Sequence, residues 1–115
     1  MSKAIQPIVI DYIKKELNTP NVRAEKPAEM SGGWVIVTLK DDSTKDHLNA
    51  ATIEITVYHD TKAQVLALYE ELKDAMDDIT NTANIVHCKR ENGKDNIDTA
   101  SKKYNYRCFY NLKFF

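Results

Sequence analysis

The chain has 115 residues, the size of one ordinary domain of roughly 100–150 residues. Its 16 basic and 17 acidic residues leave a net charge of -1, which argues against a protein whose main function is to hold nucleic-acid phosphates. Three Gly and three Pro exclude collagen-like and low-complexity classes. Hydrophobic residues make up 43% of the chain, sufficient for a core without disulfides or metal. We therefore expect a single domain over residues 1–115.

The first 18 residues predict an amphipathic helix. Apolar residues recur there at i, i+3, i+4, i+7 and i+8, and Asn18-Thr19-Pro20 ends the pattern. Gln6, Asp11 and Lys14 interrupt the apolar residues, which predicts neither a signal peptide nor a membrane span. We expect the protein to be made and folded in a cytoplasm. The apolar positions are Ile5, Ile8, Val9, Tyr12, Ile13 and Leu17.

The next segment predicts strands. Residues 21–26 can form a short strand, and a β-rich run over 34–39 follows a turn at Ser31-Gly32-Gly33. Residues 40–46 are polar and predict a loop. Residues 51–59 alternate apolar and polar side chains, as in a strand with one buried face.

A second helix is predicted directly after that strand. Thr61 and Gln64 have the spacing of a capping box at its start. Apolar side chains then continue at helical spacing to Ile79. A turn over 81–84 and a short strand over 85–89 follow.

The last quarter of the chain predicts a loop and a long strand. Residues 90–98 are polar and contain Asn92-Gly93, so we expect a mobile loop there. The last strand runs from about Lys103 to the terminus, with its even-numbered side chains on one face. The order α-β-β-β-α-β-β predicts an α+β fold, a mostly antiparallel sheet with two helices packed on one face.

Metal-ligating and nucleophilic residues show no spacing typical of a site. His47, His59 and His87 lack the spacing of metal ligands, and His87 and Cys88 should point to opposite faces of one strand. We expect Cys88 and Cys108 to be buried free thiols. The sequence has no nucleophile elbow and no phosphate-binding loop. We therefore predict a protein that is not an enzyme, with no catalytic residue, cofactor or metal.

Opposite charges gather in two parts of the chain. Five carboxylates in the second half of the second helix oppose one lysine, and from residue 89 onwards seven cations oppose three carboxylates. The two segments are either solvated faces or the two halves of a head-to-tail contact between copies, a type of contact that closes into rings. The candidate residues are Glu70, Glu71, Asp74, Asp77, Asp78, Arg90, Lys94, Lys102 and Lys103.

The last strand adds Arg107, Phe109 and Phe115 as candidates. Both phenylalanines interrupt the face of this strand that should be polar. They indicate either a strand covered on both sides or a subunit interface, where aromatic residues and arginine are enriched. We expect the 90–102 loop to take part in the same contact.

The order of elements resembles that of the small tail terminator proteins of long-tailed bacteriophages, the group of tail-to-head joining proteins that includes lambda minor tail protein U. The likeness covers nearly the whole chain and is one of architecture, without a signature motif. It comprises the helix IQPIVIDYIKKELN, the strand ATIEITVYHD running directly into TKAQVLALYEELKDAMDDI, and the closing segment ENGKDNIDTASKKYNYRCFYNLKFF.

The resemblance implies a non-enzymatic assembly protein. It would form a hexameric ring on the finished tail tube, stop its polymerisation and dock the filled head. The implied partners are further copies of the chain, the tail tube protein and a head-completion or connector protein, without nucleic acid or membrane. The implied location is the tail-head junction of the virion, reached after assembly in the host bacterial cytoplasm.

Three alternatives remain open. The chain can be another neck, head-closure or tail component, since these are also small ring formers. It can be a small cytoplasmic ligand-binding or regulatory domain, which predicts a concave pocket with converging polar groups. It can also be a small hydrolase with a site around Asp46, His47 and His59.

Overall fold

The computed structural model describes residues 5–25, 27, 32–45, 48–81, 85–91, 94–98 and 103–115, with the backbone alone at residues 45, 94–98 and 103. These residues form two helices and six strands, with one short 3-10 helix, η1. In order, they are α1 (Ile5–Leu17), β1 (Val22–Arg23), β2 (Trp34–Lys45), β3 (Leu48–His59), α2 (Lys62–Asp77), η1 (Ile79–Asn81), β4 (Ile85–Arg90), β5 (Lys94–Asp98) and β6 (Lys103–Phe114).

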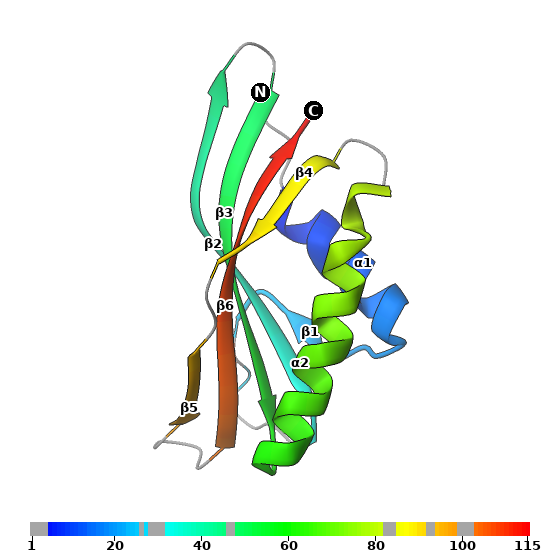
Figure 1. Cartoon of the computed structure of the whole chain (residues 1–115), viewed down its shortest axis with the longest axis vertical. Helices are drawn as coiled ribbons and strands as arrows, with labels where there is room; N and C mark the ends of the chain where they lie inside the picture. Colours follow the sequence, from blue (N-terminus) through cyan, green and yellow to red (C-terminus); the bar gives the residue numbers. More distant parts are fainter. Residues whose placement is uncertain are drawn as a thin grey trace.

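The strands form one sheet in the order β1-β2-β3-β6-β4, and β5 also pairs with β6. Among the described strand pairs, only β1–β2 is parallel. Both helices lie on the same side of this sheet (Figure 1). The predicted fold class, an α+β fold with a mostly antiparallel sheet and two helices on one face, is therefore confirmed. We call the sheet face away from the helices the open face.

Period-two alternation decides which side chains form the core. The odd-numbered residues of β3 and the even-numbered residues of β6 face the helices, because successive side chains of a strand point to opposite faces. The predicted helical stripes of α1 and α2 cover them. The core of the described residues includes Val9, Ile13, Val37, Ile53, Ile55, Val57, Val65, Leu72, Met76, Ile79, Cys108, Tyr110, Leu112 and Phe114.

Strand β2 is longer than predicted. The prediction of a loop over 40–46 is wrong for residues 40–45, because the segment from Asp41 to Lys45 pairs with β3. Residues 46 and 47 lie outside the described residues. Polar side chains do not prevent this pairing, since the ladder joins backbone groups. The register shifts between Leu39 and Asp41, as at a β-bulge. Strand β1, by contrast, is shorter than the predicted 21–26.

Strand β5 is an element that the sequence did not predict. The mobile loop expected over 90–98 is wrong, because residues 94–98 pair with residues 103–107 of β6. Strands β4 and β5 follow one another along the same edge of β6, with Arg90 opposite Tyr110 and Lys94 opposite Arg107. The predicted turn at Asn92-Gly93 lies outside the described residues.

The sequence signals for the helix ends are confirmed. Thr61 Oγ1 accepts the backbone N–H of Gln64 at 3.2 Å, and the Thr61 hydroxyl donates to Gln64 Oε1 at 2.9 Å. At the end of α1, Asn18 has a φ of 52° and the Thr19 N–H donates to the carbonyl of Lys14 at 3.1 Å. This combination is typical of a helix that ends in a left-handed residue.

Replacing the N-cap of α2 tests this assignment. We expect Thr61→Ala to lower the free energy of unfolding by about 1 kcal/mol, because one N–H of the first turn loses its acceptor. Urea denaturation followed by circular dichroism measures the change. Thr80→Ala is the matched control, since Thr80 is exposed in η1. An equal loss in both variants would contradict a specific capping role.

Candidate functional site

Three of the five acidic candidates on α2 and at its C-cap line a groove against α1. Its volume is about 380 Å³, and no Lys or Arg of the described part of the chain lines it. The Tyr12 hydroxyl joins the two helices by donating to the carbonyl of Ala75 at 2.6 Å. Burial, with Glu16 and Asp78 adding to it, raises the pKa of Tyr12. This acidic groove is lined by Glu16, Leu17, Glu71, Asp74, Ala75 and Asp78.

The other two acidic candidates, Glu70 and Asp77, do not line this groove. Lys73 Nζ donates to Glu70 Oε1 at 3.0 Å. Asp77 lies within electrostatic reach of Arg90 on β4. Both carboxylates therefore have a cationic neighbour in their own chain. The 3.6-residue period of the helix separates these two positions from the groove-lining ones.

The two arginine candidates lie on opposite faces of the sheet. Arg90 is opposite Tyr110, whose side chain belongs to the helix-side core. Arg107 is opposite Thr56 on the open face. There an Arg107 nitrogen is 3.9 Å from a carboxylate oxygen of Glu54, which is also 3.9 Å from Lys40 Nζ. Arg107 thus has a carboxylate neighbour in its own chain.

The lysine candidates lie near the β5–β6 pair or outside the described residues. Lys94 is opposite Arg107, and Lys103 is opposite Asp98. The structure describes the backbone of these two lysines and not their side chains. Lys102 lies outside the described residues, as does part of the predicted 90–102 loop. These positions therefore stay predictions.

The two phenylalanine candidates are outside the helix-side core. Phe109 lies on the open face opposite Glu54 and is half-buried. Phe115 follows the end of β6 and is 60% exposed. Strand β6 lies between β3 on one side and β4 and β5 on the other, so Phe109 is near the middle of the open face. The predicted role of both residues in a subunit contact remains a prediction.

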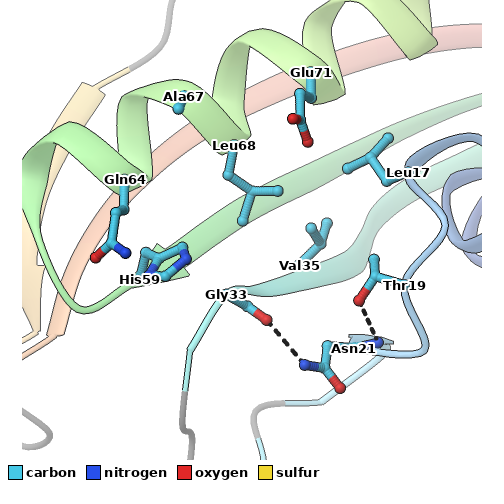
Figure 2. Close-up of a pocket in the computed structure, with 10 residues that line it drawn as sticks. All are labelled: Leu17, Thr19, Asn21, Gly33, Val35, His59, Gln64, Ala67, Leu68 and Glu71. Carbon is cyan, nitrogen blue, oxygen red and sulfur yellow. Dashed lines mark hydrogen bonds between the residues drawn. The ribbon is translucent and has the colours of Figure 1, made fainter.

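A second cavity lies beside the acidic groove, between the start of α2, the end of α1 and the sheet (Figure 2). Its volume is about 350 Å³, at the lower end of the range of about 300–1,000 Å³ for ligand pockets. Leu17 and Glu71 line both cavities, so the two are neighbours. The pocket is lined by Leu17, Thr19, Asn21, Gly33, Val35, His59, Gln64, Ala67, Leu68 and Glu71.

Backbone groups fix the polar side chains at the lower wall of this pocket. Asn21 Nδ2 donates to the carbonyl of Gly33 at 3.2 Å, and Thr19 Oγ1 accepts the N–H of Asn21 at 3.2 Å (Figure 2). His59 Nδ1 accepts the N–H of Asp60 at 2.9 Å. Since Nδ1 is an acceptor, the proton of the neutral ring is on Nε2.

Gly33 leaves the room that the His59 ring occupies. A Cβ at position 33 would lie 3.0 Å from His59 Cδ2 and 3.2 Å from Leu68 Cδ2. Both distances are shorter than ordinary van der Waals contacts of about 3.5–4.0 Å. Any larger residue at this position therefore displaces the side chains that form one end of the pocket.

The two cysteines lie on the helix side of the sheet as free thiols. Burial raises the pKa of Cys88 to about 12, with Asp77 adding to the effect. Burial also raises the pKa of Cys108 to about 12, against the opposing effect of Arg90. A thiol with such a pKa forms little thiolate near neutral pH, so neither cysteine has the character of a nucleophile.

The histidines do not converge with other metal-ligating groups in the described part of the chain. His87 is opposite Lys113 and Cys88 is opposite Leu112, which places them on opposite faces as predicted. Among the described residues, no group of three His, Cys, Asp or Glu could hold a metal ion. Asp46 and His47 lie outside those residues. Neither described helix is long and apolar enough to cross a membrane.

Comparison with known proteins gives no family. No protein-family model matches the sequence, and no curated protein matches it either. Three surfaces of the molecule are candidates for function: the acidic groove, the pocket and the open face.

Sequence reasoning missed Glu54 and the pocket. Glu54 is polar at an alternating strand position, which predicted no more than a solvated side chain, yet its side chain is only 15% exposed between Lys40 and Arg107. The pocket combines side chains from α1, β2, β3 and α2 and the segment after α1. The sequence signals near it were the Ser31-Gly32-Gly33 turn, the capping box at Gln64 and the candidate His59, and nothing in the sequence joined them.

A double-mutant cycle tests the role of Gly33. We expect Gly33→Ala to lower the free energy of unfolding by about 1 kcal/mol, because the new methyl crowds His59 and Leu68. In a His59→Ala background the loss should shrink, since the nearest atom is gone. Gly32→Ala is the control: Gly32 has a φ of 75° and open space around its Cα, so its loss should come from the backbone and stay the same in both backgrounds. If the His59→Ala background reduced the losses caused by Gly33→Ala and Gly32→Ala equally, the predicted contact between position 33 and His59 would be contradicted.

The raised thiol pKa values predict a pH dependence. Above about pH 9 the unfolded thiols ionise while the folded ones stay protonated, so the free energy of unfolding should fall as the pH rises from 9 toward 12. The slope is at most about 1.4 kcal/mol per pH unit for each thiol. Urea denaturation between pH 8 and pH 10.5 measures it. The Cys88→Ala, Cys108→Ala double variant should show a shallower slope, and an unchanged slope would contradict the assignment.

Proposed function

We propose that this protein is a non-enzymatic phage assembly protein of the tail terminator type. In this proposal it forms a hexameric ring on the tail tube, ends the polymerisation of the tube and joins the tail to the head. Its partners are further copies of the chain, the tail tube protein and a head-completion or connector protein. It acts at the tail-head junction of the virion, after assembly in the host bacterial cytoplasm.

The observation that carries the proposal is the one-sided cover of the sheet. Both helices pack on one face of a molecule 44 Å long, and no helix that the structure describes lies on the other face (Figure 1). An antiparallel sheet can have one solvated face, but that face is then polar. Here it contains Phe109 and the buried Ile36. Aromatic residues on an otherwise polar face are typical of protein interfaces.

The positions of the charged surfaces also support a ring. The acidic groove belongs to the helix layer, and Lys89, Arg107 and Lys113 lie on the open face. The open face also carries Asp41, Glu54 and Glu91, and these three carboxylates balance the three cations. A head-to-tail contact needs two different surfaces on one chain, as rings do and two-fold dimers do not. The acidic groove and the open face are two different surfaces of one chain, so they could form such a contact.

The pocket favours a second candidate, the small ligand-binding or regulatory domain. Its polar side chains converge on a partly apolar cavity, which is the usual form of a small-ligand site. This candidate predicts a defined ligand and does not need a ring. The other neck and tail components share the properties that support the first candidate, and association alone does not separate them from it.

The association state tests the proposal. We expect the mass measured by light scattering on a sizing column to rise with concentration from that of the 13.2 kDa chain toward that of a hexamer. Higher salt should weaken the association, because it screens charges between copies. A dimer at every concentration and salt level would contradict the ring and favour the second candidate. A monomer at every condition would contradict assembly through contacts of the chain alone.

A charge reversal in the acidic groove locates the contact. We expect Asp74→Lys to lower the association, because Asp74 lines the groove. Glu70→Lys is the matched control: it makes the same change of charge four residues earlier on α2, outside the groove. Equal effects of both variants would show a dependence on net charge and contradict a contact at the groove.

A further inference from the structure

Three polar groups of the pocket have no hydrogen-bond partner among the described residues. His59 uses Nδ1 for the N–H of Asp60, which leaves Nε2 as a donor. Gln64 uses Oε1 for the Thr61 hydroxyl, which leaves its amide NH₂ group. Glu71 has neither an ion pair nor a hydrogen bond in the described part of the chain. These three groups are therefore available to a ligand.

The Glu71 end of the pocket selects a cation. Figure 2 shows the Glu71 carboxylate directed into the space beside Leu17 and Leu68. Among the described residues, no Lys or Arg lines the pocket or the acidic groove next to it. The groove adds Glu16, Asp74 and Asp78 to the negative charge at this end. A charged group that enters here is stabilised only if it is positive.

The opposite end selects a hydrogen-bond acceptor. His59 and Gln64 both line that end of the pocket (Figure 2), and each offers an N–H. A carbonyl or carboxylate oxygen accepts from such donors. Thr19 and Asn21 are held by backbone groups on the wall across from α2, so they limit the width of the pocket.

The distance between the two ends sets the length of the ligand. Gln64 and Glu71 are seven residues apart on α2, which is about 10.5 Å along the helix axis. Leu68, Ala67 and Val35 line the space between them. A ligand that fits carries a carbonyl, an apolar stem and a terminal cation. Arginine and lysine have this form, because their methylene stems pack on apolar surface while the charge stays at the tip.

We propose that this pocket binds an arginine or lysine residue, with the side-chain cation at Glu71 and the main-chain oxygen at His59 and Gln64. The residue can belong to another polypeptide or be a free amino acid, and both carry the same groups. The pocket does not depend on the proposed ring. Its test measures binding to a monomer at low concentration, so a failure of one proposal leaves the other standing.

Chemical shift mapping with small probes tests the pocket. The probes are Nα-acetyl-L-arginine amide, Nα-acetyl-L-norleucine amide and free L-arginine, titrated into the ¹⁵N-labelled chain. We expect the capped arginine to shift the backbone amides of Gly33, His59 and Leu68 saturably. The dissociation constant should be on the order of 1 mM, because a partly solvated ion pair is weak. The norleucine probe, which has the stem without the cation, should produce no such shifts.

Two matched variants locate the cation. Glu71→Gln should weaken binding of the capped arginine about threefold to fivefold, the effect of losing an exposed ion pair. Glu70→Gln should leave binding unchanged, since Glu70 lies outside the pocket on the same helix. Absence of saturable shifts, equal binding of norleucine or equal losses in both variants would overturn the proposal. Free arginine binding more tightly than the capped form would identify a free amino acid as the ligand, and the reverse order a polypeptide.

Discussion

The burial of one face of β6 is the constraint on which the rest of the structure depends. This strand lies between β3 on one side and β4 and β5 on the other. Its side chains from Cys108 to Phe114 alternate between the core under the helices and the open face. A shift of one residue in the register would exchange the two faces and expose the core side chains. The register of β6 therefore determines which residues are available for function.

The same alternation places polar side chains of neighbouring strands next to one another on the open face, where they form hydrogen bonds and ion pairs. The Thr52 hydroxyl donates to Asn111 Oδ1 at 2.8 Å, and Asn111 Nδ2 donates to Glu91 at 2.8 Å. Glu54 lies near this row, beside Arg107 and Lys40. The open face is thus held by side-chain contacts between neighbouring strands, which stabilise a sheet without a covering layer. Such a preformed surface loses little conformational entropy when a partner binds.

The helix layer carries the other two candidate surfaces, the acidic groove and the pocket, and the helical period of α2 decides which of its carboxylates line them. Glu71, Asp74 and Asp78 face α1, whereas Glu70 and Asp77 face other neighbours. Glu71 belongs to the acidic groove and to the pocket. It is the residue through which a contact at the groove and a ligand in the pocket would affect each other.

The sequence by itself determined the secondary structure wherever side-chain patterns are strong. The stripe of α1, the cap at Thr61 and the alternation of β3 and β6 are local properties of the chain, and they predicted the fold class. It did not determine the end of β2 or the presence of β5, because backbone pairing with a neighbouring strand, and not side-chain polarity, stabilises them. Nor could the sequence predict that Arg90 and Arg107 lie on opposite faces of the sheet, or that residues from several elements form a pocket beside Gly33. Those results depend on which elements pack together, and only the tertiary structure decides that.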